Sequence, residues 1–287
     1  MSTVAAMRLA DCGGTTVDGW ELGWSQVIGS RHAQVSEDSL AHDARTLAGQ
    51  PPGTPRALCL AVADGVGGGA RGDIASAALA GHCVLLPSEL LGHAEGIAQW
   101  MALAEAQVQL RLREVSYAPG AATLAAAWLL PAASSSDAPS RVCGHVLRVG
   151  DARVYRFDGH SMDCLTTDQT YASVGETPPE GARFDDPARM VGTGFAGEPE
   201  VLPLQLAPGD TLLLCSDGLH RGLTARQMAA LLRQGGTLDA CALRLAQLAR
   251  HEGSDDDITV LLARAVAARA AHTPLAGGLA GLLRRIF

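Results

Sequence analysis

Short apolar runs recur along the chain, and three of them adjoin an aspartate. The run 58–63 leads into Asp64 and a glycine-rich stretch, and the run 211–215 leads through one serine into Asp217. Asp256 stands just before the last apolar run. Runs of this length, bounded by glycine or charged residues, are typical of buried strands. The pattern therefore predicts strands whose ends present carboxylates, and we expect chemistry at Asp64.

The rest of the pattern predicts further strands and helices. Alternating apolar positions predict a first strand, and apolar stripes at helical spacing predict amphipathic helices. Apolar runs separated only by Gly-Asp and Asp-Gly turns predict an antiparallel meander of three strands, 142–149, 153–157 and 162–165. The other predicted elements are strands at 20–28, 58–63, 123–130, 211–215 and 258–262, and helices at 74–91, 95–113, 224–234 and 237–252.

These elements are assigned to a single domain over residues 20–264. Residues 1–19 are small and polar and are predicted to be a flexible lead-in. Positions 167–197 carry many Gly, Pro, Asp and Glu residues, which predicts a long irregular flap, and loops of that length are often functional. Residues 265–287 form an Ala-rich C-terminal tail, for which a frayed end is favoured over an amphipathic docking segment.

Composition narrows the class of protein. The chain has 287 residues, of which 47% are hydrophobic, and a formal net charge of -8. No basic stripe could neutralise phosphates, so nucleic acid is not an expected partner. The seven cysteines are scattered, never form Cys-x-x-Cys, and fit core packing in a reducing cytoplasm. No export signal and no membrane-spanning run is recognisable, so we expect no transmembrane anchor.

The glycine-rich stretch 64–73 admits three interpretations. A glycine-rich loop between a strand and a helix can bind phosphate, but this one lacks the ending of a P-loop and the spacing of a dinucleotide-binding motif. The stretch begins with an acid, which suits a hard metal ion. The structural alternative is a tight turn in which Asp64 caps the following helix.

Four aspartates from separate segments favour the metal interpretation: Asp38, Asp64, Asp217 and Asp256. Buried carboxylates that repel one another are costly unless a cation or a proton compensates them. Carboxylates with a backbone carbonyl and no His or Cys cluster suit Mg²⁺ or Mn²⁺ better than Zn²⁺. The four aspartates together therefore predict a site for divalent metal.

Six motifs follow one another in the chain: 37–39 (EDS), 64–68 (DGVGG) with 72–76 (GDIAS), 149–155 (VGDARVY), 165–168 (LTTD), 214–219 (LCSDGL) and 256–260 (DDITV). In this order they resemble the metal-dependent protein serine/threonine phosphatases of the protein phosphatase 2C type, in the bacterial form of that family. The resemblance extends over about residues 20–262. It implies an α+β fold, a four-layer α-β-β-α sandwich of two antiparallel sheets flanked by helices, with an irregular flap.

The resemblance also implies roles for particular residues. Asp64 would bridge two divalent ions, Mn²⁺ or Mg²⁺. Asp38 and the Gly65 carbonyl would help to hold one ion, and Asp217 and Asp256 would hold the other. A water bridging the metals would attack phosphorus in line, with no covalent phosphoenzyme.

Asp151 has two alternative roles. It matches a position that in bacterial relatives can contribute to a third, weaker metal site. The alternative is an aspartate in an ordinary hairpin turn.

Three positions depart from the family pattern. Ala33 stands where the bacterial pattern commonly has a phosphate-binding arginine, so Arg31 or His32 is the candidate for that role. Val66 replaces the histidine of an Asp-Gly-His motif, which leaves water or the substrate to supply the proton.

The third departure is Asp257, which replaces the usual Asn beside the last metal aspartate. Its added negative charge could tighten metal binding or raise a neighbouring pKa. Asp257 and Glu37 are therefore candidates for residues just outside the metal ligands.

The sequence favours a cytoplasmic bacterial phosphatase that removes phosphate from Ser and Thr of proteins and opposes a Ser/Thr kinase. Its substrates would be phosphorylated proteins. The alternative is a catalytically weak regulatory or phosphoprotein-binding module that keeps the fold, for which Ala33 and Asp257 are the motivating residues. A phosphotransferase with Asp64 as nucleophile is a third, less favoured hypothesis.

Overall fold

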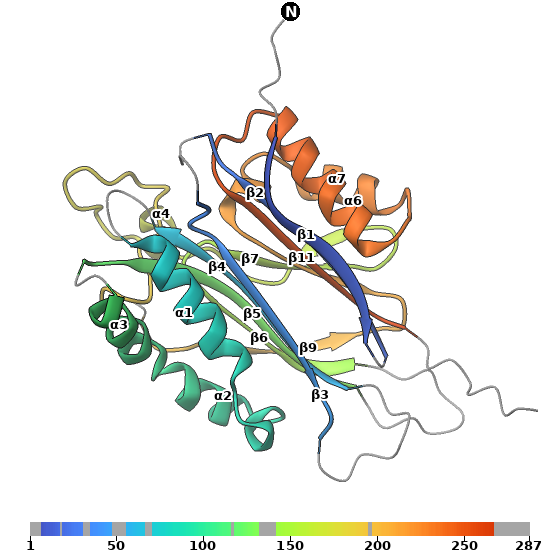
Figure 1. The fold of residues 1–287 in the computed structure, drawn as a ribbon, viewed down its shortest axis with the longest axis horizontal. Helices are drawn as coiled ribbons and strands as arrows, with labels where there is room; N and C mark the ends of the chain where they lie inside the picture. The colour runs from blue at the N-terminus through green and yellow to red at the C-terminus, as the bar shows by residue number, and fades with distance from the viewer. Residues whose placement is uncertain are drawn as a thin grey trace, which may run out of the picture.

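Two antiparallel β-sheets pack face to face, and helices cover the outer face of each sheet (Figure 1). The computed structural model describes residues 7–17, 19–30, 35–47, 56–66, 71–115, 118–131, 142–194 and 197–266. Among these residues the four-layer sandwich with an irregular flap, as predicted from the sequence, is confirmed. None of the described helices is both long and apolar enough to cross a membrane.

The first sheet contains both ends of the described chain. Its described strands lie in the order β1-β2-β11-β10-β7-β8, and every neighbouring pair is antiparallel. The bounds are β1 Arg8–Val17, β2 Trp20–Ile28, β7 Arg153–Phe157, β8 Met162–Cys164, β10 Thr211–Cys215 and β11 Ile258–Ala265.

The second sheet is built from the middle of the chain. Its described strands lie in the order β3-β4-β5-β6-β9, again all antiparallel. The bounds are β3 Ser39–Arg45, β4 Ala57–Val66, β5 Ala121–Pro131, β6 Val142–Val149 and β9 Val201–Leu206.

Strand β4 is continuously apolar because both of its faces are covered. Leu58, Leu60 and Val62 pack between the sheets, while Cys59 and Ala61 face the helices. A strand that is covered on both faces reads as an unbroken hydrophobic run. The large side chains fill the space between the sheets, and the small ones let the helices lie close to the second sheet.

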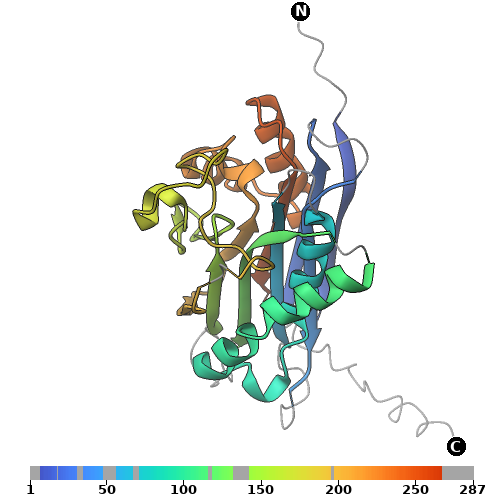
Figure 2. The same cartoon turned by 90° about the vertical axis from the view of Figure 1, so that its left-hand side faces the viewer.

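The helices on the two sheets come from different parts of the chain, teal to green on the second sheet and orange on the first (Figures 1 and 2). α1 Gly72–Val84, α2 Ala94–Met101 and α3 Ala104–Val115 lie on the second sheet, with a 3₁₀ turn at Ser88–Leu90. α6 Ala225–Leu232 and α7 Leu238–His251 pack on the first sheet. Two short helices, α4 Tyr171–Val174 in the flap and α5 Asp217–His220 after β10, complete the described elements.

The start of α6 illustrates how the sequence sets a helix boundary. Thr224 accepts a hydrogen bond from the backbone N–H of Gln227, and the Gln227 side chain accepts one from the backbone N–H of Thr224. This capping box satisfies two backbone donors that a helix start leaves without partners. The predicted helix at 224–234 therefore begins where its threonine indicates.

The predicted lead-in over residues 1–19 is wrong for most of its length. Arg8–Val17 forms β1, which pairs with β2 from Arg8 opposite Ile28 to Val17 opposite Trp20. The strand is polar because it lies at an exposed sheet edge, so it carries no apolar run. Edge strands are often polar, and hydrophobic patterning does not reveal them.

The predicted three-strand meander is confirmed for its last two strands, β7 and β8, which pair antiparallel, but it is wrong for the first. β6 pairs with β5 and β9, whereas β7 pairs with β10 and β8 in the other sheet. The turn at Gly150 and Asp151 therefore carries the chain from one sheet to the other. Turn residues show that a strand ends, but they do not show which sheet the next strand joins.

Further boundaries differ from the sequence predictions. The helix predicted at 74–91 ends at Val84. The helix predicted at 95–113 is interrupted at Ala102 and Leu103, which separates α2 from α3. β4 continues beyond the predicted 58–63 to Val66 because β5 pairs with it along that length. The predicted tail lies outside the described residues from position 267 onward, and the assignment of 20–264 to one domain stays a prediction.

Candidate active site

Asp64 lies within β4, close to its end, where the second sheet faces the first. Its register partner is Thr123 of β5, and Gly65 lies opposite Ala122. Asp217 comes from the first sheet, at the start of α5 directly after β10. The backbone N–H of Asp217 donates to Oδ2 of Asp64 over 3.4 Å, so the two predicted metal aspartates meet across the sheets.

Asp38 precedes β3 and is 6% exposed. Its Oδ2 is buried and has no hydrogen-bond partner among the atoms of the described residues. Burial, followed by the nearby charge of Asp257, raises the pKa of Asp38 well above its ordinary value. A buried carboxylate oxygen without a donor is unfavourable, and binding a proton or a cation would stabilise it.

Asp257 fixes the backbone beside Asp38. Its Oδ1 accepts the backbone N–H of Gly29 and its Oδ2 accepts the backbone N–H of Glu37, each at 2.6 Å. Both oxygens of this 3%-exposed carboxylate therefore hold the segment that leads to Asp38. Asp256, the preceding residue, lines the cleft described below.

Gly65 and Glu37 form a close backbone contact at the same place. The N–H of Gly65 donates to the Glu37 carbonyl over 3.2 Å. A Cβ on Gly65 would lie 2.4 Å from that carbonyl oxygen, so only glycine fits at this position. Glu37 also lines the cleft.

Asp151 lies in the turn that crosses between the sheets, not in the hairpin turn that was the alternative. It is 3% exposed and faces the same cleft as Asp64. Burial, followed by the charge of Asp217, raises the pKa of Asp151 to about 7. Its position is therefore that of a residue of the site.

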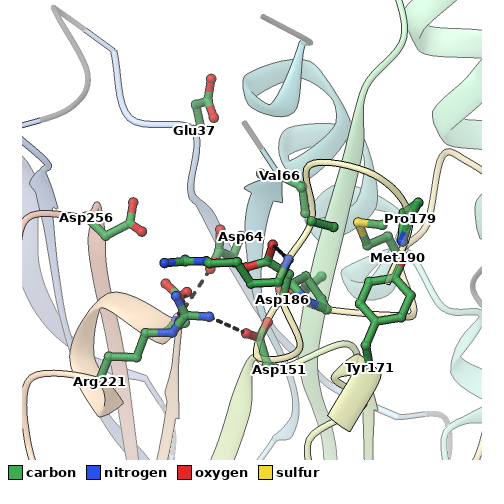
Figure 3. A pocket seen from close by; sticks show the side chains of 16 residues that line it. Glu37, Asp64, Val66, Asp151, Tyr171, Pro179, Asp186, Met190, Arg221 and Asp256 are labelled. Atoms are coloured by element: carbon green, nitrogen blue, oxygen red, sulfur yellow. Dashed lines mark hydrogen bonds and ion pairs between the residues drawn. The ribbon is translucent and has the colours of Figure 1, made fainter. Parts of the chain in front are cut away.

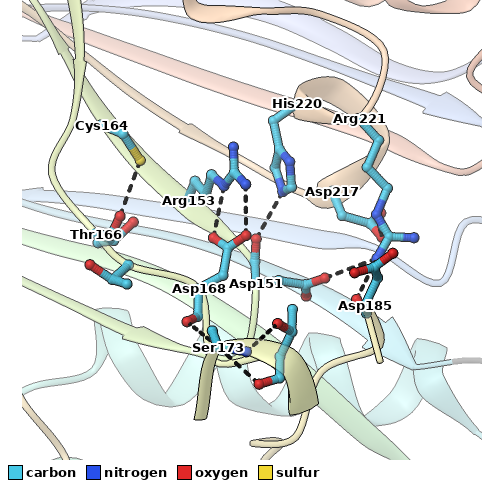
Figure 4. A network of polar contacts seen from close by, with 12 residues as sticks. Asp151, Arg153, Cys164, Thr166, Asp168, Ser173, Asp185, Asp217, His220 and Arg221 are labelled. Atoms are coloured by element: carbon cyan, nitrogen blue, oxygen red, sulfur yellow. Dashed lines mark hydrogen bonds and ion pairs between the residues drawn. The ribbon is translucent and has the colours of Figure 1, made fainter. Parts of the chain in front are cut away.

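Arg221 is a site residue that the sequence analysis missed. Its Nε forms an ion pair with Oδ2 of Asp217 and its Nη2 donates to Oδ2 of Asp151, each at 3.1 Å (Figure 4). Asp217 and Arg221 are four positions apart, one helical turn, and that spacing was the available signal. Burial lowers the pKa of Arg221, but the carboxylates of Asp217, Asp151 and Asp64 outweigh burial and raise it.

A polar network extends from this arginine toward the flap (Figure 4). A ring nitrogen of His220, Nε2, lies 2.9 Å from the Asp151 carbonyl oxygen. Arg153 pairs with Asp168 through two hydrogen bonds of 2.8 and 2.6 Å. Burial, followed by the charge of Arg153, lowers the pKa of His220 to about 4, so this imidazole is neutral at physiological pH.

These residues surround a cleft of about 540 Å³. One wall carries the carboxylates, and the flap supplies the opposite wall (Figure 3). The carboxylate wall contains Glu37, Asp64, Asp151, Asp217 and Asp256, and the flap wall contains Tyr171, Pro179, Ala182, Arg183, Asp186, Pro187 and Met190.

The buried, ionised carboxylate of Asp64 is unfavourable unless a positive charge lies beside it. Burial raises its pKa well above the ordinary value, and the charges of Asp217, Asp38, Asp151 and Asp256 raise it further. Several ionised carboxylates this close are unfavourable without a compensating charge. Arg221 supplies one positive charge at the edge of the group.

The donor set fits hard divalent ions. It consists of carboxylates, and Oδ2 of Asp38 is an acceptor without a donor among the described residues. Oxygen ligands of this kind suit Mg²⁺ and Mn²⁺. In the described residues no three His, Cys, Asp or Glu side chains already converge as a metal cluster.

Some predicted residues cannot be placed. Arg31 and His32, the candidates for binding phosphate, lie outside the described residues, as do glycines 67–69 of the glycine-rich stretch. The structure thus brings Asp38, Asp64, Asp151, Asp217 and Asp256 to one region, with Gly65, Glu37 and Asp257 beside them.

The chain matches known proteins in sequence. Residues 157–266 match the family described as Stage II sporulation protein E (SpoIIE). The serine/threonine phosphatase Stp of Listeria monocytogenes is 34% identical over 128 residues, which cover 41% of this chain and 50% of that protein. The protein of the same name from Listeria welshimeri is 31% identical over 223 residues, covering 70% of this chain and 82% of that protein.

The fold matches solved structures as well. The catalytic domain of the serine/threonine protein phosphatase PstP, solved in complex with two manganese ions, has a TM-score of 0.64 and 25% identity. The match covers 86% of this chain and 99% of that one. The chain therefore belongs to the family of bacterial serine/threonine phosphatases of the protein phosphatase 2C type. The alignment with the L. monocytogenes protein spans half of that protein's length.

Proposed function

We propose that this chain hydrolyses phosphoserine and phosphothreonine in proteins with the help of two divalent ions, Mn²⁺ or Mg²⁺. The observation that carries the proposal is the meeting of buried carboxylates from both sheets around Asp64. Each of these carboxylates raises the pKa of Asp64, and Asp38 keeps a buried oxygen without a donor among the described residues. Membership of the phosphatase family and the two manganese ions of the PstP structure support the choice of reaction and ion.

Each residue of the site would have a separate role in holding the ions or the substrate. Asp64 would contact both ions, with Asp38 and the Gly65 carbonyl on one side and Asp217 and Asp256 on the other. When bound, the ions would supply an acidified water as nucleophile and positive charge against the phosphoryl oxygens. Arg31 or His32 would bind the substrate phosphate. The neutral His220 holds the Asp151 turn and carries no charge to the site.

The flap would form the part of the site that meets the protein substrate. Its base is held to the second sheet, because Arg148 of β6 hydrogen-bonds the Thr167 carbonyl and pairs with Glu200 over 3.0 Å. The C-terminal end of the flap is held by Glu105 of α3, which accepts the N–H groups of Gly192 and Gly194. The wall opposite the carboxylates is therefore fixed at both ends.

A direct assay tests the proposal. Purified protein is incubated with an aryl phosphate and with a phosphothreonine peptide, with Mn²⁺ or with a chelator, and phosphate release is measured. We expect release from both substrates only when the metal is present. No release from either substrate with Mn²⁺ would refute the proposed activity.

We also propose that the protein acts in the cytoplasm and opposes a Ser/Thr kinase. All seven cysteines are unpaired, as expected in a reducing compartment. Deleting the gene should leave more phosphothreonine on cytoplasmic proteins, and deleting the opposing kinase as well should remove that excess. Phosphothreonine levels that do not change in the single deletion would refute this part.

The alternative function is a phosphoprotein-binding module with weak catalysis. The observation that favours it is Asp257, which replaces the usual Asn of the family pattern and whose two oxygens hold backbone N–H groups before Asp38. Calorimetry separates the two functions: two tight divalent sites with turnover support the enzyme, and absent or single-site binding supports the module.

A further inference from the structure

Arg221 is an arginine placed among buried carboxylates. Its Nε contacts Asp217 and its Nη2 contacts Asp151, both through Oδ2 at 3.1 Å. The same Nη2 lies 3.4 Å from the carbonyl oxygen of Asp185 in the flap. One guanidinium thus joins the start of α5, the turn between the sheets, and the flap (Figure 4).

The backbone holds this arginine in place. Its N–H donates to the Asp217 carbonyl over 2.9 Å, which continues the helical turn of α5. The preceding residue, His220, contacts the Asp151 carbonyl through Nε2. His220, the last residue of α5, and Arg221, which follows it, therefore both hold Asp151: His220 contacts the backbone carbonyl and Arg221 the carboxylate.

The two carboxylates that Arg221 contacts need a positive charge. Asp151 is 3% exposed and Asp217 is 8% exposed, and the charge of Asp217 raises the pKa of Asp151. A divalent ion placed between them would satisfy both, but it would need the oxygens that the guanidinium already uses. Arginine keeps its proton at any pH a protein encounters, so this charge is permanent.

Arg221 contacts two of the carboxylates of the site. It contacts Asp217 through Oδ2 and Asp151 through Oδ2. Asp64 contacts Asp217 through the Asp217 N–H, and its charge raises the pKa of Arg221. The arginine therefore competes with a metal ion for the position between Asp151 and Asp217.

We propose that Arg221 is a built-in cation that occupies the place between Asp151 and Asp217 where a further divalent ion would otherwise bind. Asp151 is then a partner of the arginine and not a metal ligand. This inference rests on the proposed function, because it counts ions beyond the two assigned to Asp64 and its neighbours.

Counting bound ions tests the inference without an activity assay. Equilibrium dialysis measures Mn²⁺ per chain for the full-length wild type, Arg221→Met, Asp151→Asn, and the double variant. Arg226→Met is the matched control, because Arg226 is an exposed arginine on α6. Circular dichroism establishes that each variant is folded.

We expect Arg221→Met to bind one more Mn²⁺ than the wild type, and the double variant to lose that extra ion. The wild type, Asp151→Asn and Arg226→Met should bind equal numbers. An unchanged count in folded Arg221→Met would overturn the inference, and so would the loss of an ion in Asp151→Asn alone, because the arginine would then move aside for metal.

The remaining outcomes are also decisive. If Arg221→Met does not fold, the comparison of the wild type with Asp151→Asn decides the question by itself. If neither the wild type nor Arg221→Met binds Mn²⁺, the proposed function and this inference fail together. Equal counts above zero in those two proteins would refute only the inference.

Discussion

The backbone N–H of Asp217 donates to Oδ2 of Asp64 across the interface of the two sheets. Asp64 belongs to β4 of the second sheet, and Asp217 follows β10 of the first. The site therefore exists only when the two sheets are packed together. Core packing and catalysis depend on the same interface.

Asp64→Asn should abolish turnover and stabilise the metal-free protein. Asparagine keeps the shape and can still accept the Asp217 N–H, but it cannot supply the negative charge that holds the ions. Activity should fall by about 100-fold or more, on the scale of losing one preorganised electrostatic group. The melting temperature without metal should rise, because a buried charge that its neighbours disfavour is gone.

Asp163→Asn is the control for that substitution, since Asp163 is an exposed partner of Arg156. It should leave the rate unchanged and alter stability by less than about 1 kcal/mol. Full activity of Asp64→Asn would contradict the role assigned to Asp64.

The metal-free protein should lose stability as the pH rises. The pKa of Asp151 is raised from 3.8 to about 7 in the folded state. Between these values the unfolded chain has released this proton and the folded chain still holds it, so increasing pH favours unfolding. Asp38 and Asp64 shift in the same direction.

Thermal melts from pH 4 to pH 8 with a chelator measure this effect. Added Mn²⁺ should raise the melting temperature most at the upper end, because the ions compete with protons for the carboxylates. Stability in the chelator that rises steadily up to pH 8 would show that the carboxylate group is not under repulsion.

Asp257→Asn should destabilise the fold by about 1–3 kcal/mol. The carboxylate accepts N–H groups from both Gly29 and Glu37, and an amide can accept only one of them while its NH₂ faces the other. Urea unfolding measures the loss. A variant as stable as the wild type would show that the segment before Asp38 is held by other contacts.

Glu105→Ala should loosen the flap without disturbing the carboxylates. Glu105 accepts the N–H groups of Gly192 and Gly194 at 2.7 and 2.8 Å. Bonds to a charged acceptor contribute about 1.5–3 kcal/mol, so hydrogen exchange at these two amides should accelerate by about tenfold or more. KM for a phosphopeptide should rise more than kcat falls.

Glu114→Ala is a matched control on the same helix, because Glu114 pairs only with exposed Arg111 among the contacts of described residues. Its exchange rates at Gly192 and Gly194 should equal those of the wild type. Equal rates in Glu105→Ala as well would mean that the glutamate does not hold the flap.

Much of the fold and most of the carboxylates were predictable from the sequence. The apolar runs predicted the strands β4, β10 and β11, and the expected aspartate lies in or beside each strand. Local patterning carries this information because burial of a whole strand requires a continuous run of apolar residues. Even so, Asp64 lies inside β4 rather than beyond its end, since pairing with β5 extends the strand to Val66.

What the sequence could not reveal depends on contacts between distant segments. β1 is a polar edge strand that only its partner β2 defines. The turn at Asp151 looks like a hairpin until the two strands beside it are seen to join different sheets. Arg221 resembles an ordinary helical arginine, and its partner Asp151 is 70 positions away in the chain.

The most direct test of the whole account is phosphate release from a phosphothreonine peptide by the full chain as Mn²⁺ is added after chelation. We expect no release in the chelator, release that rises with Mn²⁺ to saturation in the wild type, and no release at any Mn²⁺ concentration in Asp217→Asn. Release by the chelated wild type, or equal release by folded Asp217→Asn, would contradict the claim that these carboxylates act through bound metal.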